Sequence, residues 1–180
     1  MSNPHILEAI INRINRQPSD KPMLVPGSTG KTGSRIGKRL EARGLPVRLG
    51  SRNRQPPFDW EKSATWEPAL SGVSAAHVSF YPDLAVPGAA ESIRAFTQLA
   101  LKKGVKRLVL LSGRGEREAQ RSETMLQQSS ADWTILQASW FSQHFSESFS
   151  LEPILAGEVA LPVGEIAKPF ITSPMSPSPP

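Results

Sequence analysis

The sequence predicts an α/β fold built on a doubly wound parallel sheet. Short apolar runs alternate with segments of helical periodicity, which is the pattern of strand–helix–strand units. The run 107–112, Arg-Leu-Val-Leu-Leu-Ser, has an unbroken apolar centre, as expected for a parallel strand that helices cover on both faces. A chain of 180 residues, 38% of them hydrophobic, can form one domain with a sizeable core.

The first half of the chain opens with a helix and then alternates strands with helices. Aliphatic side chains recur at helical spacing between Ile6 and Ile14, and Gly44 marks the end of a second helix. The elements expected, in order, are a helix over 5–17, a strand over 23–25, a helix over 32–43, a strand over 47–50 and a short extended piece at Asp59 and Trp60.

The second half continues the alternation. Lys102 and Lys103 fall in the last turn of a long helix, where they complement its dipole, and Gly104 ends it. The elements expected are helices over 64–70, 87–103 and 116–128, strands over 75–81, 107–112 and 133–137, and a mixed segment over 141–151. This alternation predicts helices on both faces of one parallel sheet.

Three parts are expected along the chain. Residues 1–22 form an N-terminal helical arm and residues 23–170 the α/β domain. Residues 171–180 form a disordered tail, because a low-complexity run of Pro and Ser cannot build a core. The domain is expected to be incomplete at its C-terminus, and the hypothesis of a shifted reading frame before the tail can be tested on the gene's nucleotide sequence.

Composition and charge exclude several classes of protein. The chain has no cysteine, and its three histidines lack the spacing of metal ligands, so no metal site is expected. Its 21 Lys and Arg against 16 Asp and Glu give a charge of +5, but they are scattered, so no nucleic-acid partner is expected. Without a signal peptide or the roughly 18 apolar residues of a membrane span, a soluble cytoplasmic protein without a membrane partner is expected.

The segment after the first strand has the composition of a phosphate-binding loop. Gly27, Gly30 and Gly33 stand at G-x-x-G-x-x-G spacing, between a predicted strand and a predicted helix. One glycine permits a tight turn, one lets the backbone approach a pyrophosphate, and one allows close packing of the helix. The helix N-terminus presents free N–H groups to an anion. The segment therefore predicts a dinucleotide-binding, Rossmann-like domain.

An NTPase is the alternative for the same segment. Gly30-Lys31-Thr32 matches the end of a P-loop, but that motif needs a glycine five residues before Gly30, where this chain has Val25. The strongest predicted strand ends at Ser112 and not at an acidic ligand for Mg²⁺. These two departures favour the dinucleotide.

The end of the second strand indicates which dinucleotide. An NAD site places an Asp or Glu there, about 20 residues after the loop, to hold the ribose 2′-hydroxyl. The segment from Leu49 to Asn53 has no acid. Arg52, with help from Ser51, can instead hold a 2′-phosphate. NADP(H) rather than NAD(H) is the predicted cofactor, and a solvated loop arginine is the alternative for Arg52.

These residues lie in segments that resemble the NmrA-like family of atypical short-chain dehydrogenases, nearest to festuclavine dehydrogenases and their bacterial relatives. The resemblance runs from about Met23 to Pro169 in family order. Its segments are LVPGSTGKTGSRI, VRLGSRN, PFDWEKSATWEPAL, YPDLAVPGAAESIRAFTQLALKKGVKRLVLLSGRG and ADWTILQASWFSQHFSE. The combination of FDW, a later TW, and WTI before SWF is more specific than the glycines. The family's usual threonine before the first glycine is Pro26 here.

The resemblance implies roles for particular residues of this chain. The pyrophosphate would be held by Gly27, Ser28, Thr29, Gly30, Lys31, Thr32 and Gly33, and the adenosine phosphate by Ser51 and Arg52. Asp59 and Trp60 would lie near the adenine, and Tyr81, Pro82, Ser112 and Gly113 would flank the nicotinamide ribose. Trp140, Phe141 and Gln143 would border the substrate pocket, whereas Trp133 is expected in the core.

No catalytic residue can be assigned. Short-chain dehydrogenases commonly use a Tyr with a Lys four residues later, but four residues after the only tyrosine, Tyr81, stands Ala85. The titratable candidates near the expected cleft are Glu116, Glu118, Glu123 and His144, of which Glu118 and Glu123 are expected on a solvated helix face.

The function predicted is that of an NADP(H)-binding protein derived from an NADPH-dependent reductase, with a small organic molecule as its substrate. Transfer of a hydride alone does not require the missing pair, because the cofactor carries that chemistry. The alternative is a non-catalytic, NmrA-type regulator that senses the dinucleotide and acts through a protein partner. A degenerate product with an exposed sheet edge is the third possibility.

Overall fold

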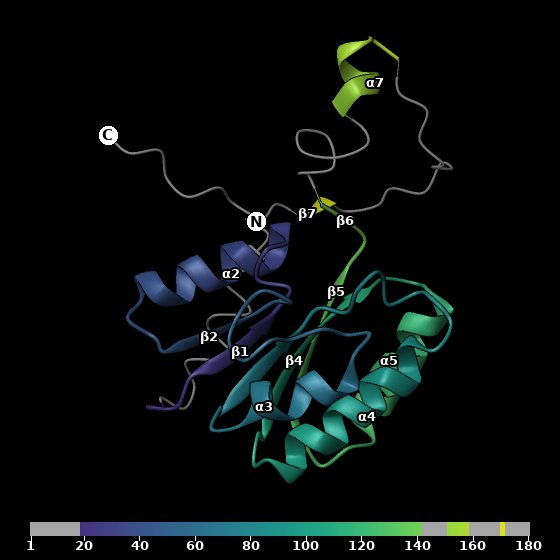
Figure 1. The fold of residues 1–180 in the computed structure, drawn as a ribbon. Helices are drawn as coiled ribbons and strands as arrows, with labels where there is room; N and C mark the ends of the chain where they lie inside the picture. Colours follow the sequence, from purple (N-terminus) through teal and green to yellow (C-terminus); the bar gives the residue numbers. More distant parts are fainter. Residues whose placement is uncertain (1–18, 142–150, 159–169, 172–180) are drawn as a thin grey trace, which may run out of the picture.

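Five parallel strands form one sheet in the order β2-β1-β3-β4-β5, with helices on both of its faces (Figure 1). The computed structural model describes residues 19–141, 151–158 and 170–171. Strand β2 pairs with one edge of β1 and strand β3 with the other, so the strand order changes direction at β1. This confirms the predicted α/β fold with a doubly wound parallel sheet.

The observed elements follow the predicted alternation. The strands are β1 (Met23–Pro26), β2 (Val47–Gly50), β3 (Ala75–Val78), β4 (Arg107–Gly113) and β5 (Asp132–Ala138). The helices are α2 (Lys31–Ala42), α3 (Trp66–Leu70) after the 3-10 turn η1 (Ser63–Thr65), α4 (Ala89–Lys102) and α5 (Arg117–Gln127). Outside the sheet, β6 (Trp140–Phe141) pairs with β7 (Phe170–Ile171), and α7 (Leu151–Leu155) lies between them in sequence.

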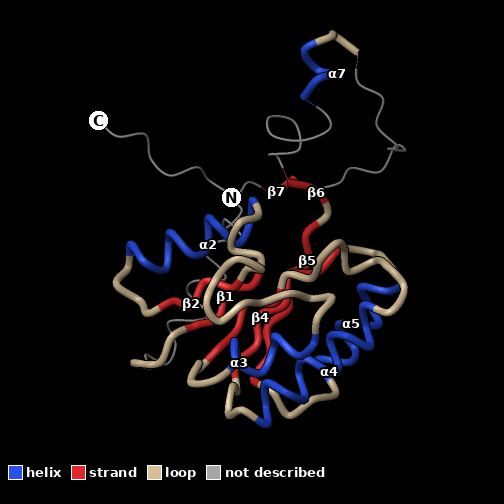
Figure 2. Tube along the Cα trace, in the orientation of Figure 1, coloured by secondary structure: helices blue, strands red, loops and turns tan. Residues whose placement is uncertain are grey.

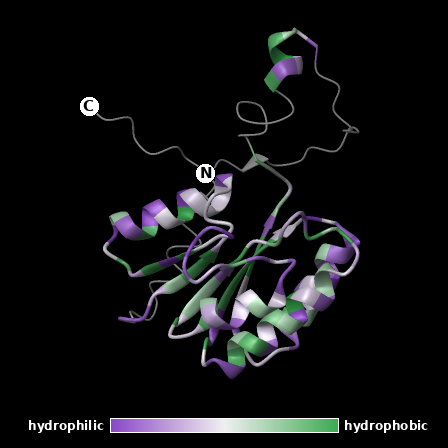
Figure 3. Ribbon diagram, in the orientation of Figure 1, coloured by the Kyte–Doolittle hydropathy of each residue, from purple (hydrophilic) through white to green (hydrophobic). Residues whose placement is uncertain are grey.

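Helices α3, α4 and α5 cover one face of the sheet and α2 covers the other, as the trace in Figure 2 shows. Alternate residues of a strand point to opposite faces, so each strand contributes to two clusters. Leu108 and Leu110 pack on the α4 side with Phe96, whereas Val109 packs on the α2 side with Ile36. Coloured by hydropathy, the central strands are the most apolar part of the sheet (Figure 3).

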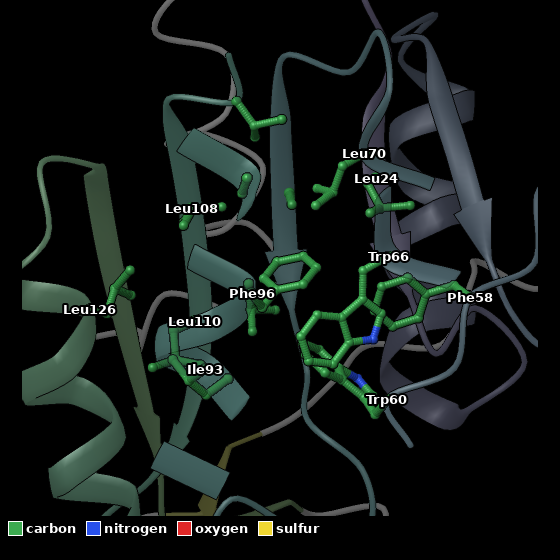
Figure 4. Packing of buried hydrophobic residues seen from close by; sticks show 14 of the residues in the cluster. Leu24, Phe58, Trp60, Trp66, Leu70, Ile93, Phe96, Leu108, Leu110 and Leu126 are labelled. Carbon is green, nitrogen blue, oxygen red and sulfur yellow. The ribbon is translucent and has the colours of Figure 1, made fainter. Parts of the chain in front are cut away.

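Aromatic rings fill the core between β3 and α4. Trp60 lies 5.1 Å from Phe58 and 5.0 Å from Phe96, and Trp66 lies 5.7 Å from Phe96, measured between ring centroids (Figure 4). These rings come from the segments that carry FDW and TW. Their packing holds the chain between β2 and α3 against the sheet, close to the carboxyl ends of the strands.

The prediction of an extended piece at Asp59 and Trp60 is wrong. Neither residue is in a strand: the Lys62 N–H donates to the Asp59 carbonyl oxygen at 3.2 Å, which closes a turn through Trp60. The Asp59 N–H donates to Thr65 Oγ1 at 2.9 Å. The indole N–H of Trp60 donates to the carbonyl oxygen of Ser79 at 2.8 Å. This bond uses the carbonyl oxygen of the residue that follows β3, which ends at Val78, three residues before the predicted end.

Two further expectations differ from the structure, and several lie outside it. Trp133, expected in the core, is 38% exposed on β5. Ile171, expected to begin the tail, is the last residue of β7 and pairs with Phe141. The helix expected over 5–17, the residues Gln143 and His144, and the rest of the tail, 172–180, lie outside the described residues. None of the helices within the described ranges is both long enough and apolar enough to cross a membrane.

His77 is a polar residue in the middle of this core. It lies on β3, is fully buried, and among the described residues neither of its ring nitrogens has a hydrogen-bond partner. Burial lowers the pKa of His77 to about 4, because the charged ring loses its hydration, and the backbone of Val109 offsets this only in part. The folded protein therefore holds this ring neutral at neutral pH.

We predict that His77 makes the folded state sensitive to acid. The unfolded chain protonates the ring below its ordinary pKa of 6.5, whereas the folded chain resists protonation down to about 4. Between these two pKa values the unfolded state binds more protons than the folded state. The contribution of His77 to the free energy of unfolding is therefore fully present above pH 6.5, and about 3 kcal/mol of it is lost as the pH falls to about 4. Chemical denaturation of the wild type and His77→Leu across this window measures it. Equal pH dependence in the two proteins contradicts the prediction.

Candidate functional site

A groove of about 440 Å³ opens at the carboxyl ends of β1, β2 and β3. The sheet order reverses there, between β1 and β3, and open α/β sheets bind their ligands in the crevice at such a switch point. The lining residues that the sequence predicted are Gly27, Thr29, Gly30, Lys31, Thr32, Gly33, Ser51, Arg52, Asp59, Trp60, Tyr81 and Pro82. The fold thus brings four separate predicted segments together around one groove.

The glycine loop packs closely against the start of α2. Gly27 has a φ of +65°, and the N–H of Gly30 donates to its carbonyl oxygen at 2.9 Å. A Cβ on Gly33 would overlap that oxygen and lie 2.7 Å from the carbonyl carbon. Glycine at position 33 therefore allows the first turn of α2 to lie against the loop.

The N-terminus of α2 is suited to an anion. Gly30 is the N-cap residue and provides no side-chain cap, and the first turn has no acidic residue. The first N–H groups of a helix have no partner within the helix, and together with the helix dipole they favour negative charge. Lys31 and Thr32 line the groove from this turn. The arrangement fits a phosphate group.

The groove continues past the end of β2. Ser51 is buried, and its Oγ has no hydrogen-bond partner among the described residues. The next residue, Arg52, is exposed and also lines the groove. A buried hydroxyl without a partner is rare in a folded protein and marks a position where a ligand can supply one. On the opposite wall, Asp59 Oδ1 accepts the Glu61 N–H at 3.1 Å.

Some predicted site residues do not line the groove. Ser28 is buried, and both its N–H and its hydroxyl donate to the carbonyl oxygen of Gly50, at 3.1 and 3.2 Å, so that it fastens the loop to β2. Ser112 and Gly113 end β4 and are not among the residues that line the groove. Phe141 belongs to β6, outside the five-stranded sheet, and the side chain of Trp140 lies outside what the structure describes. Conversely, Phe58, Glu61, Ser79 and Phe80 line the groove although the sequence did not indicate them.

The acidic candidates differ in their surroundings. Burial, and to a smaller extent the charge of Asp83, raises the pKa of Glu116. The carboxyl group of Glu116 also packs closely on Gly113: a Cβ on that glycine would lie 2.7 Å from the carboxyl carbon. Glu118 pairs with Arg121 at 2.8 Å. The expectation that Glu123 lies on a solvated face is wrong, because Glu123 is buried against the sheet by its bonds to Ser112 and Gln137.

A parallel α/β sheet with a glycine loop at its switch point defines the Rossmann-like class of nucleotide-binding domains. No family model matches the chain. Among known proteins it is 28% identical over 168 residues to prestalk A differentiation protein A of Dictyostelium discoideum, covering 84% of this chain and 55% of that one.

Two further relatives are named as oxidoreductases or dehydrogenases. The chain is 31% identical over 134 residues to the uncharacterized oxidoreductase YesF of Bacillus subtilis, covering 69% of this chain and 46% of that one. It is 29% identical over 139 residues to agroclavine dehydrogenase of Claviceps fusiformis, covering 69% and 48%. The chain therefore spans about half the length of these relatives.

Solved structures share the fold. A nucleoside-diphosphate-sugar epimerase of Staphylococcus aureus superposes with a TM-score of 0.62 at 14% identity, over 76% of this chain and 55% of the other. A short-chain dehydrogenase/reductase superfamily protein of Agrobacterium tumefaciens, solved with NAD, gives 0.57 at 20%, over 73% and 54%. An NADPH-dependent quinone oxidoreductase of Escherichia coli, solved with NADPH, gives 0.52 at 21%, over 74% and 53%.

The relatives that are named as enzymes are thus an oxidoreductase and a dehydrogenase, and the solved structures with the same fold include NAD(P)-binding reductases. This confirms the resemblance to dehydrogenases and reductases that the motifs of the sequence carry.

We predict that Gly33→Ala disrupts the glycine loop. The added methyl group overlaps the Gly27 carbonyl, and either the loop or the start of α2 must move, at a cost of about 1–3 kcal/mol. Thermal unfolding followed by circular dichroism measures the loss. Ser34→Ala is the matched control on the same turn, since its hydroxyl donates to the Lys31 carbonyl oxygen of the same turn at 3.3 Å. A Gly33→Ala protein as stable as this control would refute the prediction.

Proposed function

We propose that the chain binds NADP(H) in this groove and is the dinucleotide-binding part of an NADPH-dependent, NmrA-like reductase. The observation that carries the proposal is the end of β2, where Ser51, whose hydroxyl has no hydrogen-bond partner in the described part of the chain, is followed by the exposed Arg52. Both residues line the groove. A serine and an arginine together suit a 2′-phosphate, whereas the residues that end β2 offer no carboxylate for a ribose 2′-hydroxyl.

The rest of the groove supports the same ligand. The pyrophosphate would lie at the glycine loop and the start of α2, and Arg52 and Ser51 would hold the adenosine 2′-phosphate. When bound, the cofactor would supply a hydride to the substrate. The Agrobacterium and Escherichia coli proteins are described with NAD and with NADPH respectively, so the fold accepts both dinucleotides. The preference of this chain then depends on its own residues after β2.

The substrate class follows from the residues that the chain lacks. With Tyr81 as the only tyrosine and Ala85 four residues later, the pair that delivers a proton in common short-chain dehydrogenases is absent. A small organic acceptor that needs only hydride delivery, such as an iminium, quinone, azo compound or flavin, would be compatible with this site.

We predict that Arg52→Ala selectively weakens NADPH binding. Loss of charged hydrogen bonds to the 2′-phosphate should raise the Kd for NADPH roughly ten- to a hundredfold and leave the Kd for NADH unchanged. Isothermal titration calorimetry of the 180-residue protein with both cofactors measures this. Arg54→Ala is the matched control, because Arg54 is exposed two residues further on and does not line the groove. Equal Kd values of the wild type for NADPH and NADH would sink the proposed specificity.

A dinucleotide-sensing regulator that acts through a protein partner is the second candidate function. Two observations favour it: the missing Tyr–Lys pair, and a relative from Dictyostelium that is named as a differentiation protein and not as an enzyme. The two candidates differ in turnover, which a regulator does not need.

We predict that the chain oxidises NADPH in the presence of at least one acceptor from a panel of quinones, azo compounds and imines. Loss of absorbance by the reduced cofactor reports the hydride transfer, and Gly33→Ala serves as the control for a disrupted loop. Tight NADPH binding without turnover of any acceptor would instead favour the regulator.

A further inference from the structure

A buried glutamate joins α5 to the carboxyl ends of β4 and β5. The Ser112 hydroxyl donates to Glu123 Oε1 at 2.6 Å. The amide nitrogen of Gln137 donates to both carboxylate oxygens of Glu123, at 2.9 and 2.8 Å. Ser112 and Gln137 are register partners on the two strands, so one carboxylate connects three elements.

This carboxylate is held by neutral partners alone. Glu123 and Ser112 are 7% and 3% exposed, and within the described ranges no Lys, Arg or His pairs with Glu123. A buried carboxylate without a cation costs stability even when it is hydrogen-bonded. Its presence therefore suggests a role beyond packing.

The network fixes the direction of the Ser112 hydroxyl. A serine hydroxyl has one proton and two lone pairs. The short bond to Glu123 takes the proton, since the other acceptor near it, the Gly113 carbonyl oxygen, lies 3.5 Å away. The oxygen of Ser112 can therefore only accept a hydrogen bond from any further partner.

Ser112 lies next to the end of the groove that the glycine loop does not occupy. Val78, the last residue of β3, pairs with Leu110 of β4. Two residues after Val78 stands Phe80, which lines the groove, and two residues after Leu110 stands Ser112. A dinucleotide whose pyrophosphate lies at the glycine loop and whose adenosine lies past β2 must extend its other half toward β3 and β4.

We propose that Glu123 is a positioning residue, which holds the Ser112 oxygen as a hydrogen-bond acceptor for the nicotinamide half of the cofactor. The donors of that half are the ribose hydroxyls and the carboxamide amino group. The inference rests on the proposed binding of NADP(H) and adds Glu123 as the residue that would orient Ser112 toward the cofactor's reactive end. It involves no contact with the adenosine half.

We predict that Ser112→Ala and Glu123→Gln weaken NADPH binding but leave the binding of 2′,5′-ADP unchanged, because that fragment lacks the nicotinamide half. Loss of one hydrogen bond should raise the Kd for NADPH roughly three- to tenfold. The double variant should lose no more than the larger single effect, since both changes remove the same interaction. Calorimetric titration with the two ligands measures all of these constants.

Glu118→Gln is the matched control, the same substitution on the same helix but outside the network. It should change neither Kd. If Glu123→Gln does not fold, as judged by circular dichroism, Ser112→Ala alone decides, since it removes only a hydroxyl.

The outcomes separate this inference from the proposed function. If the wild type binds 2′,5′-ADP and Ser112→Ala binds NADPH as tightly as the wild type, Glu123 is structural and the NADP(H) site stands. An equal loss of both ligands in Ser112→Ala also overturns the inference. If the wild type binds neither ligand, both proposals fail.

Discussion

The close approach between the glycine loop and the first turn of α2 is the constraint on which the site depends. Gly33 lies so near the Gly27 carbonyl that no side chain fits between them. This contact turns the chain sharply after β1 and directs the uncapped N-terminus of α2 at the groove. The anion-binding character of the groove therefore arises from backbone geometry, and side chains such as Ser51 and Arg52 add selectivity to it.

The sheet topology and the aromatic core position the other segments of the groove relative to the glycine loop. Strand order reverses beside β1, so the loops after β1, β2 and β3 meet at one edge. The cluster around Trp60 and Phe96 then holds the Asp59 turn as the wall opposite the glycine loop. On the far side, the bonds of Glu123 fasten α5 to the ends of β4 and β5. The topology and the aromatic cluster thus shape the groove, and the Glu123 bonds hold the strand ends beyond it.

Features with a local cause could be predicted from the sequence. The apolar runs predict the strands. The spacing of Gly27, Gly30 and Gly33, directly after a predicted strand, predicts the phosphate-binding loop. The turn at Asp59 could not be predicted, because it depends on a bond from the Trp60 indole to Ser79, nineteen residues away in the chain. The burial of Glu123 could not be predicted for a similar reason. Its position in the helix is compatible with a solvent-facing or a sheet-facing side chain, and only its partners on two strands show that it is buried. The exposure of Trp133 likewise depends on its place at the edge of the described sheet.

The most direct test of the account is amide hydrogen exchange, followed by mass spectrometry, of the protein with and without NADPH. The backbone N–H groups from Gly27 to Gly33 are the groups that the account assigns to the pyrophosphate. Slower exchange concentrated in that segment on addition of NADPH, with a smaller effect after β2, is the expected result. Unchanged exchange there, or protection confined to the opposite edge of the sheet, would contradict the central claim.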